Sequence, residues 1–465
     1  MEKYIGNKTA ILPLLHNFIV ERAPRAGSIS DLFAGTTNVS RYFRARDFDV
    51  ALGDINRFSY VLGQVYVGLR EYPRFEVTAK RRVEEIRMER IHIEFLRGAK
   101  RASGAYLPSH VSASDLWRSL LPLARTLAYL QSLGEANAKP GPITEYFTQW
   151  GERACFVSQR GTAGKRNYFS RENALFLDAV LPTIRRWWQK GELSLTEAFL
   201  LMTSILEEIT ITANVNGTFH DFNRNRIWPN AQQDFFLRLP ITFASKGRFE
   251  AANNDALPFS SVVGPHDVCY IDPPYNFRQY TAYYHLLNFV AAFPFMEELA
   301  GYLSKLEYVR GQQPEDDYSS DFCYKDRFVT SLRSLFDNVD SRYVVLSYYS
   351  GRNHWNHWSK VDKPTDQGLR ELRAIFEDRT IFSDCEVVPA LDVRRNYQSR
   401  VGEQKQLVNE YLFWGVKKRA MRKKAVDLSA LGANRRFGLD DIFKHVISPR
   451  DKLQDSIVAF ASGEA

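Results

Sequence analysis

The sequence has few cysteines and no long apolar run. Its four cysteines, among 465 residues, stand far apart and form no CxxC pair: Cys155, Cys269, Cys323 and Cys385. This spacing predicts neither a zinc site nor a disulfide framework, so we expect no bound metal and a reducing, cytoplasmic setting. No apolar run reaches the ~18 residues that cross a bilayer. The first residues, MEKYIGNKTAILPLL, lack the small-residue cleavage site of a signal peptide, and we expect no membrane association.

Internal repeats and low-complexity tracts are also absent, and basic residues outnumber acidic ones. The formal net charge is +8 and the isoelectric point is about 9.1, which favours polyanionic partners. Basic residues are dense in residues 79–101, where interleaved glutamates at helical spacing favour an ordinary solvated helix face. They are denser still in residues 416–428, for which a phosphate-facing patch and a solubilising tail remain equal alternatives.

Apolar periodicity near the amino terminus predicts a parallel sheet. Residues 8–20 have helical spacing, and residues 28–35 and 48–56 have the pattern of short buried strands. A helix is predicted between them at 39–46, and strand, helix, strand in that order implies parallel strands. The sheet is therefore expected to begin within the first 60 or so residues.

The pattern then changes to helices before strands return. From about 65 to 245 the spacing is helical, with helix starts at Ser170 and at Ser194, where Glu197 completes a capping box. The sequence thus predicts a sheet that is interrupted by a helical insertion. Strand character resumes in five stretches: residues 238–244, 247–256, 267–275, 341–350 and 409–416.

The stretch DVCYIDPPYNFRQY, residues 267–280, indicates where a ligand binds. Residues 268–271 have the pattern of a buried strand, and the two prolines after Asp272 forbid both helix and ladder pairing. The chain therefore leaves the sheet abruptly, with a carboxylate at the carboxyl end of a strand. In open α/β sheets that edge is where ligands bind. Taken alone, an ordinary turn with an incidental acid is an equal alternative.

Three further stretches precede this one. YIGNK (residues 4–8) stands before a helix, DLFAGTTNV (31–39) predicts a strand, a glycine turn and a helix start, and Asp54 ends the next strand. Asp54 follows Gly35 at a spacing close to the ~20 residues at which an acid reaches ribose hydroxyls in nucleotide sites. Each stretch is weak evidence alone, but their joint occurrence in this order is far less common.

In this order the motifs resemble the Dam-like, alpha-group adenine-N6 DNA methyltransferases, which use S-adenosylmethionine. The resemblance implies an α/β fold with a mixed, mainly parallel, seven-stranded Rossmann-like sheet and an inserted helical recognition domain. It also implies double-stranded DNA as substrate, and a restriction-modification or phage-defence setting, bacterial or phage-related, with a nuclease or defence partner. The expected domains are a catalytic domain of residues 1–64 and 248–416, a recognition insertion of 65–247 and a basic extension of 417–465.

Carried over by position, the resemblance also predicts a cofactor site. Lys8 and Tyr4 would face the methionine end of the cofactor, Asp54 its ribose and Asp255 its adenine, with the turn at Gly35 around it. The full expected set is Tyr4, Lys8, Asp31, Phe33, Ala34, Gly35, Asp54, Ile55, Asp255 and Asp272.

The chemistry explains the expected catalytic residues Asp272, Pro273, Pro274 and Tyr275. The N6 lone pair of adenine is delocalised into the ring, so two acceptors, the Asp272 carboxylate and the Pro273 carbonyl, would localise it by binding both amine hydrogens. Positioning and electrostatic preorganisation would then supply the rate. The target cannot be reached inside a duplex and must be flipped out, and Tyr275 is the expected stacking partner. Tyr280, Tyr283 and Tyr284 are better explained as core residues, although stacking remains an alternative.

The expected DNA-contacting residues are Arg160, Lys165 and Arg166 in the glycine-containing loop SQRGTAGKRNYF, together with Arg278. Glycines allow close backbone approach to a phosphate, whereas an exposed linker with ordinary solubilising charge is an equal alternative. One position departs from the family pattern, since Thr37 stands where the motif has its last glycine. Three alternatives therefore stay open: cytosine-N4 methylation, RNA as substrate, and a DNA-binding module with impaired turnover.

Overall fold

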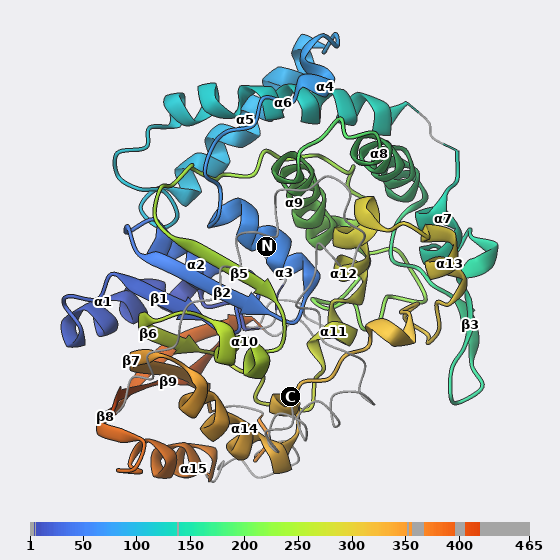
Figure 1. The fold of residues 1–465 in the computed structure, drawn as a ribbon. Helices are drawn as coiled ribbons and strands as arrows, with labels where there is room; N and C mark the ends of the chain where they lie inside the picture. Colours follow the sequence, from blue (N-terminus) through green and yellow to red (C-terminus); the bar gives the residue numbers. More distant parts are fainter. Residues whose placement is uncertain are drawn as a thin grey trace.

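The computed structural model describes residues 4, 6–136, 139–350, 353–355, 367–395 and 405–418, and its central feature is a seven-stranded sheet of order β5-β2-β1-β6-β7-β9-β8 (Figure 1). The first five of these strands run parallel, whereas β9 is antiparallel to both β7 and β8. The predicted mixed, mainly parallel sheet is thus confirmed. The strands are β1 (Ser28–Asp31), β2 (Asp49–Asp54), β5 (Phe249–Asn253), β6 (His266–Ile271), β7 (Ser341–Tyr349), β8 (Phe382–Arg395) and β9 (Lys405–Lys417).

Helices cover both faces of the sheet, because alternate strand residues point to opposite sides. Val50 and Leu52 of β2 belong to one apolar core, and Ala51 between them belongs to the other. The first core lies against α1 (Leu12–Arg22), α2 (Asn38–Arg44) and α3 (Arg57–Tyr66). The second lies against α10 (Ala256–Val262), α14 (Lys325–Asn338) and α15 (Gln367–Phe376).

The chain between α3 and β5 is mainly helical, as predicted. The caps at Ser170 and Ser194 are both present, and Glu197 completes the second as a capping box. α9 packs against α3 and α12 (His285–Ala292), so these helices share the first core with the sheet (Figure 1). The helices are α4 (Glu76–Ala79), α5 (Glu85–Ala102), α6 (Ala113–Glu135), α7 (Pro142–Phe147), α8 (Arg171–Gln189) and α9 (Leu195–Thr212).

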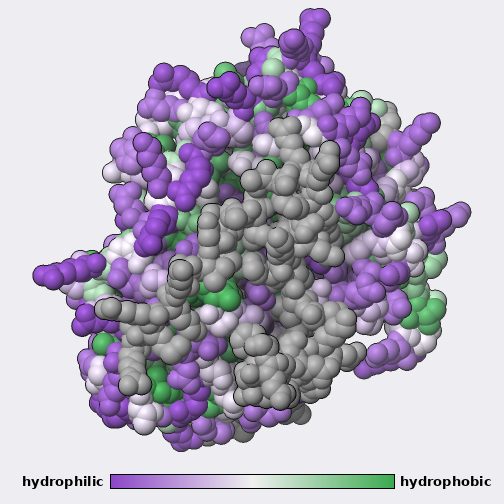
Figure 2. All heavy atoms as spheres, in the orientation of Figure 1, coloured by the Kyte–Doolittle hydropathy of each residue, from purple (hydrophilic) through white to green (hydrophobic). Residues whose placement is uncertain are grey.

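The basic segment at residues 79–101 forms most of α5, where several charges are paired. Arg87 lies 2.7 Å from Glu135, and Arg97 lies 2.6 Å from Glu94. Figure 2 shows hydrophilic side chains along the rim that α4, α5 and α6 form at the top of the view. These pairs support the interpretation of α5 as an ordinary solvated helix face.

Two strand predictions differ from the structure. Residues 238–244 form no strand; the Thr242 hydroxyl donates to the Val65 carbonyl at 2.7 Å instead, and Pro240 removes a ladder donor. β8 was not expected, because its polar sequence and Pro389 suit only a sheet edge, which is where it lies. Most of the basic stretch at residues 416–428, like most of the predicted extension, lies outside the described residues.

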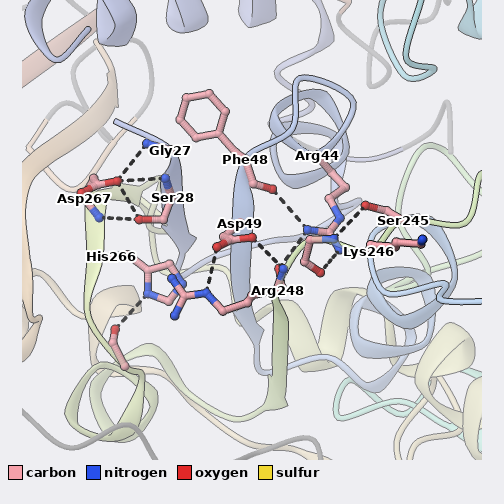
Figure 3. A network of polar contacts seen from close by, with 12 residues as sticks. Gly27, Ser28, Arg44, Phe48, Asp49, Ser245, Lys246, Arg248, His266 and Asp267 are labelled. Carbon is pink, nitrogen blue, oxygen red and sulfur yellow. Dashed lines mark hydrogen bonds and ion pairs between the residues drawn. The ribbon is translucent and has the colours of Figure 1, made fainter. Parts of the chain in front are cut away.

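A polar network ties the amino ends of neighbouring strands together (Figure 3). The Asp267 carboxylate accepts hydrogen bonds from the backbone of Gly27 at 2.8 Å and from the Ser28 hydroxyl at 2.9 Å. Asp49 and Arg248 form an ion pair at 2.8 Å. These contacts fix the sheet at the edge opposite the carboxyl ends of its parallel strands.

Among the described helices, none combines the length and apolarity that a bilayer crossing requires.

Candidate active site

Acidic side chains gather at the carboxyl edge of the parallel strands. Asp31 ends β1, Asp54 ends β2, and Asp272 follows β6 directly. Because β2, β1 and β6 are neighbours in the sheet, the three carboxylates meet at one edge, as the sequence predicted. Their charges influence one another, since both Asp272 and Asp54 contribute to raising the pKa of Asp31.

Lys8 lies between two carboxylates at this edge. Its Nζ is 3.0 Å from Asp272 Oδ1 and also contacts Glu410 Oε1. Lys8 is 5% exposed and Glu410 is fully buried in β9. The Ser347 hydroxyl donates to the same Glu410 oxygen at 2.7 Å. The structure thus brings Lys8 to the strand edge, beside Asp272 and Glu410, while its expected place at the methionine end of the cofactor stays a prediction.

The Asp-Pro-Pro-Tyr stretch leaves the sheet as its prolines require. Asp272 keeps 19% of its side chain exposed, whereas Tyr275 is buried. The Tyr275 hydroxyl donates to the Ser347 carbonyl, and its ring lies edge-on to Tyr348 with centroids 5.1 Å apart. Tyr275 therefore contributes to the second core, and its stacking on a base stays a prediction.

The turn after β1 depends on Gly35. Gly35 has φ +50°, and a Cβ there would lie 3.0 Å from the Tyr4 ring, so a side chain is excluded. Its backbone N–H donates to Asp54 Oδ2 at 2.7 Å, while Asn56 donates to Oδ1 from its backbone at 2.8 Å. Burial raises the pKa of Asp54 above its ordinary value, and these hydrogen bonds oppose the rise.

Thr37 has a left-handed backbone conformation, which glycine adopts most easily and which explains why the family pattern has glycine at this position. Its φ of 61° and ψ of 14° are left-handed, and its N–H donates to the Ala34 carbonyl at 2.6 Å. A β-branched residue in this region is strained. The threonine is fully buried, and within the described part of the chain its hydroxyl oxygen has no hydrogen-bond partner. The turn thus has the left-handed conformation despite the threonine.

Asp31 and Asp255 are buried acids at the same edge. The Ser40 hydroxyl donates to Asp31 Oδ2 at 2.7 Å, whereas Oδ1 has no partner among the described residues. Burial is the main reason that the pKa of Asp31 rises to about 7. Asp255 caps α10 by accepting from the Leu257 N–H at 3.1 Å, and burial raises its pKa too.

Aromatic residues complete the surroundings of the site. Tyr4 stacks on Tyr284 with ring centroids 4.6 Å apart, and Tyr284 is fully buried, which agrees with its expected core role. Burial and then the Asp54 charge raise the pKa of Tyr4 well above its ordinary value. Phe33 lies edge-on to Phe322, with ring centroids 5.0 Å apart. Ala34 is buried and Ile55 partly so, consistent with their places beside the turn.

Sequence reasoning missed several polar residues around the site. Arg57 forms an ion pair with Asp316 at 2.8 Å just after β2, and Asn288 donates to Asn56 at 2.9 Å. Glu410 was also missed, although its sequence carries one signal. It is an acid directly before the apolar run YLFWG of β9, where a charge needs a buried partner.

The expected DNA-contacting residues fall into two groups. Arg160 and Lys165 are exposed on a hairpin formed by β3 (Cys155–Val157) and β4 (Ala163–Lys165), so the expected loop is a short hairpin. The expectation for Arg166 is wrong. It is 3% exposed, and its guanidinium donates to the carbonyls of Tyr308 at 3.0 Å and Val309 at 3.2 Å, which leaves it unavailable to a phosphate.

Arg278 differs from both groups. It is partly buried beside the Asp-Pro-Pro-Tyr stretch, and its guanidinium carbon lies 5.6 Å from the centroid of the Tyr283 ring. Its backbone carbonyl accepts a hydrogen bond from Cys323 at 3.2 Å. The side chain is near enough to the site to remain a candidate for a phosphate contact.

Several known modification methylases and type II methyltransferases are similar to this chain. Modification methylase LlaI from Lactococcus lactis subsp. lactis is 24% identical over 74% of this chain and 46% of its own length. Type II methyltransferase M.FokI from Planomicrobium okeanokoites is 24% identical over 75% of this chain and 44% of its own length. The chain thus spans less than half of these two relatives. Type II methyltransferase M.NlaIII from Neisseria lactamica is 26% identical over 74% of this chain and 82% of its own length.

A family model, D12 class N6 adenine-specific DNA methyltransferase, matches residues 4–89 and 141–342. The matched segments include Lys8, the turn at Gly35 and Asp272, which the fold brings to one sheet edge. They make up more than half of the chain, which therefore belongs to the D12 class N6 adenine-specific DNA methyltransferase family.

Proposed function

We propose that the chain transfers a methyl group from S-adenosylmethionine to N6 of adenine in double-stranded DNA. The observation that carries this proposal is the contact of Asp272 with Lys8 at the carboxyl edge, directly after β6 and beside the turn at Gly35. Membership of the family supports the same reaction. Because two of the cited relatives are more than twice as long as the matched part, the activity of the whole protein is part of the proposal.

The residues at the edge fit S-adenosylmethionine. When bound, this cofactor supplies an electrophilic methyl group on a positively charged sulfur. Asp31 offers a buried oxygen without a partner in the described structure, and Gly35, at φ +50°, forms the tight turn beside the Tyr4 ring without a Cβ to crowd it. Asp54 would hold the ribose; its oxygens already accept hydrogen bonds, but a carboxylate has about four acceptor positions. Asp255 would lie near the adenine, and Tyr4 and Lys8 near the methionine end.

Asp272 and the carbonyl of Pro273 would act on the target amine. Both accept hydrogen bonds, so together they can hold the two N6 hydrogens and concentrate the lone pair on nitrogen. The diproline fixes that carbonyl because each proline ring restricts φ. Of the four aspartates named at this edge, Asp31, Asp54, Asp255 and Asp272, Asp272 alone is followed by a diproline, which supports its assignment to the target rather than to the cofactor alone.

The insertion, residues 65–247, is the proposed target-recognition region, with the β3–β4 hairpin as a DNA-contacting element. Arg160 and Lys165 are exposed there, as a phosphate contact requires. Phe277 follows the catalytic stretch and is 55% exposed, and we propose it as a further stacking residue for the flipped base or its neighbours. The similarity to two type II methyltransferases supports a type II modification role, for which we propose a cytoplasmic setting and a cognate restriction nuclease as partner.

Methyl transfer from tritiated S-adenosylmethionine to duplex DNA tests the proposal. We expect incorporation into DNA and, after digestion to nucleosides, label in N6-methyl-2′-deoxyadenosine. Label in N4-methylcytosine would show that the target base is cytosine rather than adenine. Label in RNA alone would show that the substrate is RNA rather than DNA. Absence of incorporation on a mixed-sequence genome, with intact DNA binding, would favour a binding module without turnover. Asp272→Ala protein serves as the matched negative control.

A further inference from the structure

Glu410 is a buried carboxylate that contacts two residues of the catalytic edge, Lys8 and Ser347. It lies in β9 opposite Tyr349 of β7 and is fully buried. A charge that is removed from water is costly unless it is paired. Here Lys8 supplies the opposite charge and the Ser347 hydroxyl donates a hydrogen bond at 2.7 Å. The carboxylate is thus paired and hydrogen-bonded inside the protein, beside the proposed active site.

Two carboxylates share one ammonium group in this arrangement. Lys8 Nζ contacts Glu410 and also lies 3.0 Å from Asp272 Oδ1. An ammonium group has three hydrogens, so it can donate to both acids at once. Its positive charge is therefore divided between Asp272, which is partly exposed, and Glu410, which is not. Removing the charge of Glu410 would leave Lys8 to pair with Asp272 alone.

Ser347 connects Glu410 to the other end of the catalytic stretch. Its hydroxyl donates to Glu410, and its carbonyl accepts from the Tyr275 hydroxyl. Glu410 therefore reaches Asp272 through Lys8 and Tyr275 through Ser347. The Glu410 side chain thus contacts two residues, Lys8 and Ser347, that themselves contact the first and last residues of the Asp-Pro-Pro-Tyr stretch.

We propose that Glu410 is a positioning residue for methyl transfer, which divides the charge of Lys8 so that Asp272 keeps its capacity to accept the adenine amine. The inference rests on the proposed function of Asp272. A carboxylate that is fully paired with lysine is a weaker acceptor and is turned toward its partner. Glu410 prevents this by holding Lys8 from behind, and it does so without touching the base or the cofactor.

Glu410→Gln is the informative substitution because the amide keeps the shape and can still accept from Ser347. We expect the single-turnover methyl-transfer rate to fall roughly 10-fold to 100-fold, the range of a lost transition-state interaction. Calorimetric affinity for S-adenosylmethionine should stay within a factor of two. Fluorescence of 2-aminopurine at the target position, which reports base capture without an N6 amine, should also stay unchanged. Glu386→Gln on β8, which loses an exposed pair with Arg22, is the matched control and should leave the rate unchanged.

A double-mutant cycle with Lys8→Gln separates positioning from simple structural support. If Glu410 acts through Lys8, adding Glu410→Gln to Lys8→Gln causes no further loss of rate, and the neutral pair should fold. An equal loss in both backgrounds would overturn the proposal, as would a wild-type rate in folded Glu410→Gln protein. If Glu410→Gln alone fails to fold, the comparison of the double variant with Lys8→Gln decides. Failure of wild-type protein to label DNA would instead contradict the proposed function itself.

Discussion

The catalytic strand edge and the β3–β4 hairpin carry their charges in opposite ways. At the edge, Lys8 and Glu410 are buried and in contact, and Asp272 is only partly exposed. On the hairpin, Arg160 and Lys165 are exposed. Loss of one partner from a buried ion pair is strongly destabilising, because it leaves an unpaired charge inside the protein. Exposed charges contribute little to stability, and the range of their attraction to a ligand depends on the salt concentration. Substitutions in the two regions should therefore give different signatures.

Arg166 marks the boundary between the two regions. It follows Lys165 directly in the sequence, yet it is buried under the carbonyls of Tyr308 and Val309. The reason is local. β4 ends at Lys165, and Arg166 points back into the protein, where Gly311 leaves room for its guanidinium. Two adjacent basic residues thus have unrelated roles, and only one of them is available to DNA.

The largest expected effect is at Asp272. Asp272→Ala should reduce the single-turnover rate by roughly 10²–10³-fold or more, the range for loss of one preorganised polar contact at a reacting group. The fold should persist because the side chain is partly exposed. Rate and circular dichroism measured on the same preparation check this. Turnover within tenfold of wild type would show that Asp272 has no catalytic role. The strand edge and the hairpin would then differ in the burial of their charges but not, by this measurement, in function.

Arg166→Ala should act on stability rather than on DNA contact. It removes a buried side chain together with its hydrogen bonds to the carbonyls of Tyr308 and Val309, and we expect the free energy of unfolding to fall by about 2–4 kcal/mol. Gly311→Ala should destabilise as well, since a Cβ would lie 2.5 Å from Arg166 Nε at φ +74°. Urea unfolding measures both variants, with Arg160→Ala as the exposed control. Unchanged stability of Arg166→Ala with weakened DNA binding would return Arg166 to the DNA-contacting group.

Asp54 tests the cofactor side of the strand edge. Asp54→Ala should weaken binding of S-adenosylmethionine by roughly 1.5–3 kcal/mol, because charge-assisted hydrogen bonds to the ribose are lost. Isothermal calorimetry measures the affinity. Asp54→Asn is the companion variant, since it keeps one acceptor oxygen for the Gly35 N–H and so limits disturbance of the turn. Equal affinity in all three proteins would contradict the ribose assignment.

A smaller effect is expected at Thr37, the one strained residue of the turn after β1. Thr37→Gly should raise the free energy of unfolding by about 1 kcal/mol, because glycine adopts φ 61° without steric cost. Thr36→Gly is the matched control: its φ is not positive, so glycine there should destabilise. Thermal unfolding and cofactor titration of both variants give the answer. A loss of cofactor affinity in Thr37→Gly would mean that the site depends on the threonine.

Much of the strand edge was predictable because strand ends are local features. Asp54 and Asp272 each follow a short apolar run, Asp31 ends the short strand before the glycine turn, and parallel order brings the three together. Glu410 was not predictable, since it meets Lys8 across 402 residues and no local pattern pairs them. β8 was missed because an edge strand tolerates the charges and the proline that weaken its pattern. Exposure of Lys165 and burial of Arg166 likewise depend on tertiary contacts.

The smallest expected effect concerns the hairpin and is visible only in DNA binding. Neutral substitution of Arg160 and Lys165 by glutamine should leave the free energy of unfolding within about 0.5 kcal/mol of wild type, as is usual for exposed positions. If both side chains contact phosphates, affinity should fall on every DNA sequence, and the slope of log affinity against log salt should decrease by about one unit per lost contact. Fluorescence anisotropy between low and moderate salt measures this slope.

The control for the hairpin lies in α5, whose Arg97 is exposed but paired with Glu94. Arg97→Gln should change neither slope nor affinity, because an arginine that contacts no phosphate displaces none of the counterions condensed on the DNA. A change of preference at a single base position in the hairpin variant would instead indicate a base contact. If affinity, slope and preference all stay at wild-type values, the hairpin is a solubilising linker. The strand edge and the hairpin would then differ only in how exposed their charges are, and DNA recognition would belong to another part of the insertion.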